Sequence, residues 1–480
     1  MENTKTSSHI VVTSIPIFSH QCSVIEFCKR LIHINKHFHV TCIFPTIDAP
    51  IPSTLKLLES LPSSIKCIFL PPIKKQNLPQ DVTLQLEHAV SQSMPSFRKS
   101  LTSLSSTSTT PLVALIVDPF ANQALEIAKD FNLLSFLYFP VSAMTTSLHL
   151  YLPTLHQQIS CQYKDHPELI RIPGCMPIHG QDFPPTFFHD RSSIAYEIIL
   201  QQTNRFSLAD GVIVNSFFEI EANMVPAWRS NIQFIYQVGP IIQNISNNSS
   251  CSLSSSRESN ESANIVKWLE NKKQDSILYV SFGSRATLSQ QQINELALGL
   301  ELSGQKFLWV LREPSNFAKI GHHSDTNDSD PLKYLPHGFL ERTKEQGLVV
   351  ALWAPQTQIL NHSSTGGFLT HCGWNSTLES IVAGVPMITW PLFGEQRMNS
   401  ILLTEELKVG LKVKFNENGV AERDEIAKVI KDLMVGEERS GILKRIQVLK
   451  DGASGALAED GSSTRALYQL GTQMESNGRK

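Results

Sequence analysis

The chain has 480 residues, of which 41% are hydrophobic and 18% charged, and its formal net charge at pH 7 is −3. This composition is typical of a globular protein with enough chain for two or three domains. Lys and Arg are too dispersed to form a nucleic-acid-binding surface. No apolar run approaches 18 residues, and the first residues lack the basic and apolar regions of a signal peptide. We therefore expect a cytoplasmic protein that neither binds nucleic acid nor spans a membrane.

The chain shows little sign of a metal site or of disulfide bonds. Its eight cysteines are scattered and form no CxxC pair, so we expect reduced thiols. His322 and His323 are adjacent, but the surrounding sequence GHHSDTNDSDP predicts a solvated loop. We therefore expect no metal cofactor.

The first half of the chain alternates short apolar runs with helical patterns. The runs are continuously apolar, which is typical of strands buried on both faces of a parallel sheet. After the first run, Val24, Phe27, Cys28, Leu31 and Ile32 recur at helical spacing. We expect strands at residues 9–16, 38–45, 65–72, 111–119, 133–140, 211–217 and 234–240.

A change of composition divides the chain. Residues 241–262 are rich in Ser and Asn and predict an interdomain linker. Beyond it, Ser289 and Gln292 predict a capping box, and residues 423–435 carry the apolar stripe of a buried helix. Further strands are expected at residues 276–284, 307–312, 348–354, 365–371, 385–391 and 409–415.

These patterns predict an α/β fold with two doubly wound, Rossmann-like domains at residues 1–240 and 263–460. We expect the two domains to face each other across a cleft, with ligands at the carboxyl ends of the strands. A nicotinamide oxidoreductase would suit this fold, but neither first strand is followed by G-x-G-x-x-G.

The segment from Trp353 to Gln396 concentrates polar and aromatic residues at expected strand ends. A strand there passes through a tight turn into a helix, whose free N–H groups suit a phosphate. Trp353 offers a flat face for a base, and Glu379 can accept hydrogen bonds from ribose. Each residue alone fits a protein core, but together they indicate a nucleotide-binding site. The residues gathered at the turn are His371, Gly373, Asn375 and Ser376.

Two candidate catalytic residues follow strands of the first domain. His20 lies on the turn after the first strand, and Asp118 ends the strongly apolar run PLVALIVDP. A neutral histidine is a suitable base at pH 7, and an anionic partner would orient it. Asp118 alone also fits a turn former before Pro119.

The segment 353–396 resembles, almost position for position, the signature box of plant secondary-metabolite UDP-sugar glycosyltransferases, an inverting family with the GT-B fold. The turn around His20, the strand end VSFGS and the segment DGSST also resemble this family. The stretches IPGCMPIHGQDF, FLERTKEQG and LPPIKKQNLPQDV are most similar to its hydroquinone and monolignol glucosyltransferase group.

This resemblance implies a UDP-glucose donor. Trp353 would stack on uracil, the backbone of Ala354 and Gln356 would hold the uridine, and Glu379 would bind the ribose. Gln396, at the end of the box, is the family's usual residue for glucose. The diphosphate would be held by Ser284, His371, Asn375 and Ser376, beside Gly373, and the sugar would be lined by Trp374, Glu395 and Gln396.

The resemblance also implies that His20 is the base and Asp118 its partner. One base and direct attack on the anomeric carbon predict inversion, and the helix N-terminus would stabilise the leaving diphosphate without a metal. The turn departs from the family pattern, because Ser19 and Ser23 replace its glycine and proline. Ser19 would contact the sugar or only reshape the turn, and Ser23 with Glu26 would cap the following helix.

The acceptor is less defined. A phenol, with a pKa near 10, suits a single histidine base, so we expect a hydroquinone, monolignol, flavonoid or similar phenol. Phe120 and Phe139 are candidate acceptor-binding residues in residues 1–240, although both also fit the core. The resemblance also implies that residues 461–480 form a helix that crosses back to this domain, and we expect a monomer. The alternatives are another UDP-sugar, such as xylose or galactose, and a non-catalytic UDP-sugar-binding protein.

Overall fold

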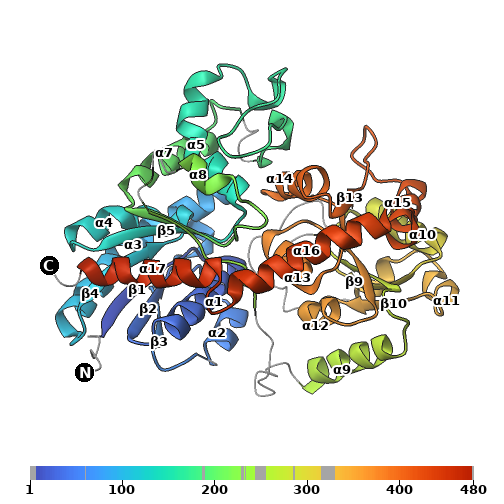
Figure 1. The fold of residues 1–480 in the computed structure, drawn as a ribbon, viewed down its shortest axis with the longest axis horizontal. Helices are drawn as coiled ribbons and strands as arrows, with labels where there is room; N and C mark the ends of the chain where they lie inside the picture. The colour runs from blue at the N-terminus through green and yellow to red at the C-terminus, as the bar shows by residue number, and fades with distance from the viewer. Residues whose placement is uncertain are drawn as a thin grey trace. The chain divides into compact units, whose positions relative to one another are not determined.

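The computed structural model describes residues 7–59, 61–79, 81–185, 190–228, 232, 234–243, 256–284, 287–314 and 330–477. His322 and His323, and most of the expected linker, lie outside the described residues. The chain divides into two compact units, Met1–Gln243 with Gly455–Lys480, and Asn244–Ser454. Each unit contains one parallel β-sheet (Figure 1).

The first unit is built on a seven-stranded sheet in the order β3-β2-β1-β4-β5-β6-β7. Every neighbouring pair of strands is parallel. Strands β1 and β6 are buried throughout, and β4 and β5 are buried except for their first residue, as their continuously apolar sequences predict. The strands are β1 Ser8–Thr13, β2 Phe38–Phe44, β3 Ile65–Phe69, β4 Leu112–Val117, β5 Leu134–Phe139, β6 Gly211–Val214 and β7 Phe234–Gln237.

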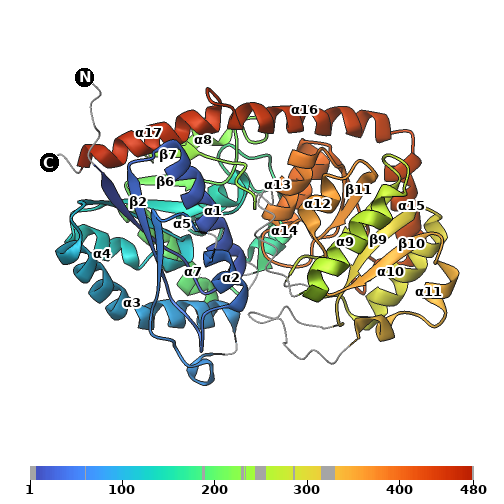
Figure 2. The same cartoon turned by 90° about the horizontal axis from the view of Figure 1, so that it is seen from below.

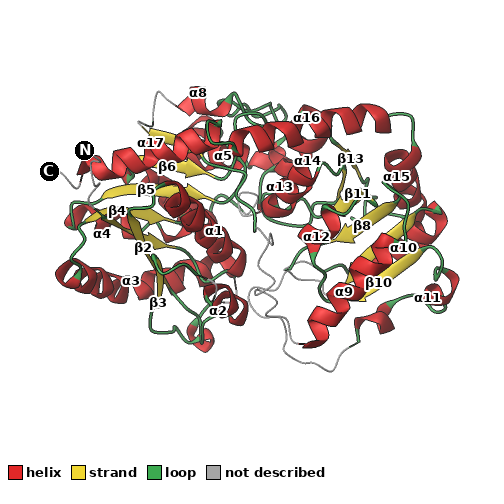
Figure 3. Cartoon of the chain, turned by 60° about the horizontal axis from the view of Figure 1, so that its bottom comes forward, coloured by secondary structure: helices red, strands yellow, loops and turns green. Residues whose placement is uncertain are grey.

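Helices cover both faces of this sheet (Figure 3). In one group α1 contacts both α2 and α17, and in another α7 contacts both α3 and α5. The helices of the unit are α1 Phe18–Ile34, α2 Pro52–Leu58, α3 Val82–Thr107, α4 Ala124–Asp130, α5 Ala143–Gln158, α7 Ile194–Arg205, α8 Met224–Trp228 and α17 Ser462–Asn477.

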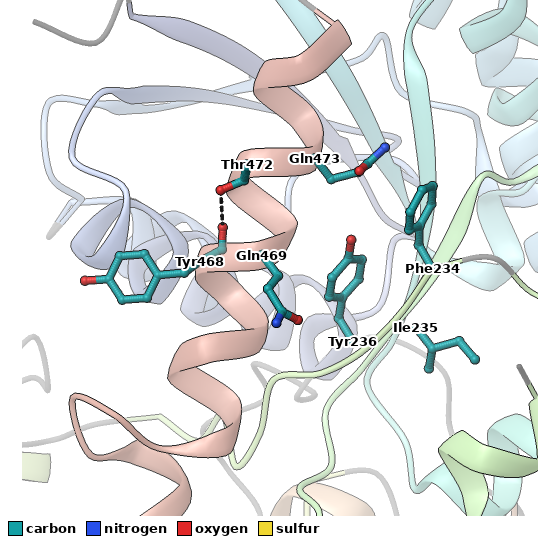
Figure 4. A pocket seen from close by; sticks show the side chains of 7 residues that line it. All are labelled: Phe234, Ile235, Tyr236, Tyr468, Gln469, Thr472 and Gln473. Atoms are coloured by element: carbon teal, nitrogen blue, oxygen red, sulfur yellow. Dashed lines mark hydrogen bonds between the residues drawn. The ribbon is translucent and has the colours of Figure 1, made fainter. Parts of the chain in front are cut away.

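The last helix, α17, is part of the core of the first unit. It contacts α1, β4 and β7, and it runs over the sheet in Figure 2. Its residues Leu467, Leu470 and Met474 belong to the same buried cluster as the strands. An open groove of about 620 Å³ lies where α17 meets β7, with Tyr236 and Gln469 among its lining residues (Figure 4). None of the predicted site residues lines this groove.

The second unit contains a six-stranded parallel sheet in the order β10-β9-β8-β11-β12-β13. Its strands are β8 Ile277–Ser281, β9 Lys306–Leu311, β10 Gly347–Ala351, β11 Thr365–Thr370, β12 Met387–Thr389 and β13 Gly410–Lys412. Its helices are α9 Ser256–Glu270, α10 Gln290–Ser303, α11 Phe339–Arg342, α12 Gln356–Leu360, α13 Trp374–Ala383, α14 Gln396–Ile401, α15 Arg423–Val435 and α16 Arg439–Leu457, which runs past the end of the unit.

Local sequence signals explain where several of these helices begin and end. The Ser289 side chain accepts a hydrogen bond from the backbone N–H of Gln292 and so caps α10, but the predicted capping box is only half formed, because the Gln292 side chain bonds instead to the backbone of Ala421. Gly384 ends α13 in the left-handed conformation. The apolar stripe of α15 is buried. All thirteen expected strands are present, so the predicted class of two doubly wound Rossmann-like domains is confirmed.

Candidate active-site residues in the two units

His20 and Asp118 form a hydrogen-bonded pair in the first unit. His20 lies in the first turn of α1, directly after β1, and Asp118 follows β4, the neighbour of β1 in the sheet. The Nδ1 atom of His20 is 2.7 Å from Oδ2 of Asp118. Since an ionised carboxylate only accepts hydrogen bonds, Nδ1 carries the proton and Nε2 is the basic atom of the neutral ring.

The carboxylate of Asp118 is fully buried and held from several sides. Its Oδ2 accepts a second hydrogen bond from Ser14 Oγ at 3.1 Å, and its Oδ1 accepts one from the backbone N–H of Phe120 at 3.0 Å. Asp118 therefore forms the turn before Pro119 and also orients the imidazole of His20. Both interpretations of Asp118 in the sequence, as a turn former before Pro119 and as the partner of His20, therefore hold together.

The prediction that Ser23 caps the helix after His20 is wrong. The helix α1 begins five residues earlier, at Phe18, with Ile17 as its N-cap residue. Ser23 is buried inside the helix, where its Oγ lies 2.8 Å from the hydroxyl of Tyr138. Ser19 lies in the first turn beside His20 and is partly exposed.

An aromatic cluster adjoins the imidazole of His20. The ring of Phe120 meets it edge-on, with centroids 6.0 Å apart. His149 of α5 contacts the rings of both Phe120 and Phe139, at 6.3 and 6.2 Å. Phe139 is only 1% exposed, which leaves an acceptor little surface to contact.

Sequence reasoning missed His149, because nothing in its helical context sets it apart. Its Nδ1 lies 2.9 Å from the carbonyl of Thr145, so Nδ1 donates and Nε2 carries the lone pair of the neutral ring. Burial lowers the pKa of His149, which favours this neutral form.

In the second unit, the strand β11 passes into the helix α13 through His371, Cys372 and Gly373. Gly373 is the N-cap residue, and the first N–H groups of α13 have no partner within the helix. These groups and the helix dipole make the turn a suitable site for a phosphate. Asn375 and Ser376 belong to the same first turn, so the structure brings three of the four predicted diphosphate-binding residues, His371, Asn375 and Ser376, together beside Gly373.

The imidazole of His371 is held between two glycines. A Cβ atom on Gly283 or on Gly373 would come within 2.6 or 2.5 Å of this ring. The Nδ1 atom of His371 and the Oδ1 atom of Asn375 are buried, and neither has a hydrogen-bond partner among the described residues. Burial lowers the pKa of His371 to about 4, so the ring is neutral at pH 7. Buried polar atoms without partners suit a site that awaits a polar ligand.

Gln356 links two of the other predicted residues. Its Nε2 donates to Ser376 Oγ at 2.9 Å and to Glu379 Oε2 at 2.7 Å. Burial raises the pKa of Glu379 to about 7. The predicted uridine, phosphate and ribose residues therefore form one network on α12 and α13.

Trp353 is unusually exposed for a large aromatic residue, with 52% of its surface accessible. It follows β10 through Leu352, whose φ of 65° is rare for a residue with a side chain. The Trp353 N–H donates to the carbonyl of Ala351 at 2.7 Å, which tightens the turn. An indole presented in this way suits stacking on a base. The neighbouring Ala354 is buried.

The predicted sugar residues are placed less openly. The Oε1 atom of Gln396 accepts hydrogen bonds from the N–H groups of Leu392 and Phe393 at 2.8 and 3.0 Å. Only Nε2 of this amide therefore remains to donate to a sugar. Glu395 is the partly exposed N-cap residue of α14. The indole of Trp374 is 2% exposed, so a sugar would reach only its backbone.

Ser284 is exposed just after β8, and its carbonyl accepts a hydrogen bond from Arg312 Nη1 at 2.7 Å.

Within the described part of the chain, no three His, Cys, Asp or Glu side chains are grouped as a metal site would require. The helices described are also too short or too polar to cross a bilayer.

Comparisons with known proteins agree with this geometry. The model of the family described as UDP-glucoronosyl and UDP-glucosyl transferase matches residues 221–450. Hydroquinone glucosyltransferase of Rauvolfia serpentina is 44% identical to the chain over 474 residues, which cover 97% of this chain and 98% of that protein.

Solved structures of plant enzymes are similar over both units. A UDP-glucosyltransferase from Polygonum tinctorium capable of glucosylating indoxyl, in complex with 3,4-dichloroaniline, is 40% identical with a TM-score of 0.88, covering 98% of this chain and 99% of that one. Phytolacca americana UGT2, complexed with UDP-2-fluoro-glucose and pterostilbene, is 39% identical with a TM-score of 0.86, covering 98% and 100%. These matches confirm the resemblance that the signature segment indicated.

Proposed function

Because the chain belongs to the plant UDP-glycosyltransferase family, we propose that it transfers glucose from UDP-glucose to the hydroxyl group of a small phenol, with inversion at the anomeric carbon. The observation that carries this proposal is the hydrogen bond between His20 and Asp118. It leaves Nε2 of the imidazole as a base, which is what deprotonation of an acceptor hydroxyl requires.

The proton transfer follows from this pair. As the acceptor oxygen attacks the anomeric carbon, Nε2 of His20 takes its proton and the ring becomes positively charged. The buried carboxylate of Asp118, fixed by Ser14 and the Phe120 N–H, stabilises that charge. The bond from the anomeric carbon to the diphosphate breaks on the opposite side, so an α-linked donor would give a β-linked product.

The second unit would hold the donor. Trp353 would stack on uracil, and Glu379 would accept hydrogen bonds from the ribose. The charge that builds on the leaving diphosphate would be met by the N-terminus of α13, with donors from His371 and Ser376. The Nε2 group of Gln396 is oriented by two backbone N–H groups that hold its Oε1. It would donate to a hydroxyl of the sugar.

The phenolic acceptor is supported by the relatives. Similar proteins are named for hydroquinone and anthocyanidins, and one similar structure contains pterostilbene. Phe120 beside His20 would provide an apolar edge for an aromatic acceptor. One chain carries both sets of residues, which supports an active monomer. Its cytoplasmic location stays a prediction from the sequence.

The test is a glucosylation assay with UDP-glucose and a panel of phenols, with the product identified by mass spectrometry and the anomeric configuration by NMR. We expect β-glucosides, and less product from UDP-galactose or UDP-xylose. The variant His20→Gln should lose turnover while it still binds UDP. No glucoside from any phenol, despite UDP binding, would overturn the proposal in favour of a non-catalytic UDP-sugar-binding protein.

A further inference from the structure

Arg312 lies at the same edge of the second sheet as the predicted diphosphate site. It is the first residue after β9, which pairs with β8, and β8 pairs with β11. Ser284 and His371 follow those two strands. The three adjacent parallel strands therefore deliver these residues to one edge. Gly283, next to Ser284, lies directly against the His371 ring.

Among the residues that the structure describes, the guanidinium of Arg312 has only a neutral hydrogen-bond partner. Its Nη1 donates to the carbonyl oxygen of Ser284 at 2.7 Å. No described carboxylate forms an ion pair with it, including its chain neighbour Glu313. Other arginines of the chain are paired, for example Arg342 with Glu301 and Arg423 with Glu295.

This isolation has an energetic consequence. The side chain of Arg312 is partly buried, and burial lowers its pKa, although a guanidinium keeps its proton at any physiological pH. A cation removed from water without an anion nearby is unfavourable, because a carbonyl dipole replaces only part of its hydration. An anion bound at the neighbouring turn after β11 would offset this unfavourable burial of the Arg312 charge.

We propose that Arg312 is a positioning residue of the donor site: it holds the Ser284 segment by the carbonyl oxygen and supplies a fixed positive charge that attracts the diphosphate of the nucleotide sugar. This inference rests on the proposed donor site and extends it. Arg312 acts on the phosphates through space, so its effect should increase with the number of phosphate charges on the ligand. The affinity for uridine, which carries no phosphate, should not depend on Arg312.

Arg439 provides a control near the amino-terminal ends of the strands of the same sheet, opposite to the ends that carry the predicted diphosphate site. It also is a partly buried arginine, and it donates to the backbone carbonyls of Gly366 and Leu433 at 3.0 and 2.9 Å. Gly366 lies at the start of β11, whereas His371 follows its end, about 16 Å away along a strand. Burial lowers the pKa of Arg439 as it does for Arg312, although the charge of Asp275 acts on Arg439 in the opposite direction.

The experiment measures the binding of UDP, UMP and uridine by calorimetry to the wild-type chain, Arg312→Met, Arg312→Lys and Arg439→Met, with thermal melting as a check of folding. For Arg312→Met we expect UDP affinity to fall about tenfold, UMP affinity to fall less and uridine affinity to stay unchanged. Arg312→Lys keeps the charge and should retain most of the UDP affinity. Arg439→Met should bind all three ligands as the wild type does, even if its melting temperature falls.

Unchanged UDP affinity in Arg312→Met would overturn the inference, and so would an equal loss for UDP and uridine. A loss in Arg312→Lys as large as in Arg312→Met would overturn the role of the charge. These outcomes leave the proposed function intact as long as the wild-type chain binds UDP. A wild-type chain that bound no UDP would overturn the proposed donor site itself.

Discussion

Gly283 and His371 approach each other so closely that no side chain fits between them. A Cβ atom on Gly283 would lie 2.6 Å from Nε2 of His371, and the φ of Gly283 is +73°. The glycine therefore serves two purposes, because its backbone adopts a left-handed conformation and its missing side chain leaves room for the imidazole.

We expect Gly283→Ala to displace His371 and weaken UDP binding by an order of magnitude or more, since the ring would lose its place beside the helix N-terminus. Calorimetric titration with UDP measures this effect. Gly304→Ala is the control, because Gly304 has a φ of +65° and no atom within 4 Å of an added Cβ. It should lose about 1–2 kcal/mol of stability to backbone strain without any loss of UDP affinity. Equal UDP affinity in both variants would contradict the steric argument.

The pair of His20 and Asp118 predicts a strong effect of a nearly isosteric change. In Asp118→Asn the side chain no longer carries the negative charge that stabilises the imidazolium, and its amide can favour the wrong tautomer. We expect kcat to fall by a factor on the order of 10³ with UDP affinity unchanged. Ser14→Ala removes only one of the hydrogen bonds to Asp118 and should cost less than about fivefold. A kcat for Asp118→Asn near that of the wild type would remove Asp118 from the mechanism.

His371 and Glu379 should make opposite contributions to the pH dependence of stability. The pKa of Glu379 is raised from 4.5 to about 7, so the folded state binds the proton more tightly than the unfolded state does. The contribution of Glu379 to the stability of the protein therefore falls as the pH rises from 4.5 to 7. The pKa of His371 is lowered from 6.5 to about 4, so the unfolded state binds the proton more tightly and this group gains stability as the pH rises from 4 to 6.5. The two slopes nearly cancel between pH 4.5 and 6.5.

Single variants should reveal these slopes. With UDP absent, Glu379→Gln should become more stable relative to the wild type as the pH rises from 4.5 to 6.5, by up to about 1.4 kcal/mol per pH unit. His371→Gln should show the opposite trend, and the double variant should follow the wild type. Denaturant unfolding at several pH values provides the measurement. Parallel curves for all four proteins would mean that neither group has a shifted pKa.

Asn399 should be needed for the shape of the phosphate-binding turn. Its Nδ2 donates to the carbonyl of Cys372 at 2.9 Å, and Cys372 is a buried residue with a φ of 65°. We expect Asn399→Ala to leave this carbonyl without a partner, to cost about 1–3 kcal/mol and to raise the KM for UDP-glucose while the KM for the phenol stays unchanged. Asn361→Ala removes a similar bond at an exposed position, to the carbonyl of Thr357, and should change neither constant. A rise of both KM values in Asn399→Ala would indicate a general loss of structure instead.

The fold was predictable because its main signal is local. Continuous apolar runs such as LVALIV mark strands that are buried on both faces, and the stripe of residues 423–435 marks a helix with the observed limits. The positions of His20 and Asp118 after two strands were also readable from the sequence. Their adjacency depends on the pairing of β1 with β4, which the chain order alone does not contain.

Side-chain partners were the part that sequence reasoning missed. Ser23 followed by Glu26 matches a capping pattern, but burial against Tyr138 places it inside the helix. Gln396 follows a strand end, yet the backbone N–H groups of its own turn hold its carbonyl oxygen. Arg312 is visible in the sequence, whereas the absence of a carboxylate partner for it among the described residues is a property of three-dimensional packing.

The helix α17 has a consequence for how the protein is made. Leu467, Leu470 and Met474 complete the core of the first unit, and Asn35 of α1 donates to the carbonyl of Leu467. During translation, residues 1–243 emerge from the ribosome long before Leu467, Leu470 and Met474 are synthesised. Part of the apolar surface of the first unit therefore stays uncovered until translation reaches the last helix. The second unit, by contrast, has all of its residues before that helix is made. The order of synthesis is thus the reverse of the order in which the two cores can be completed.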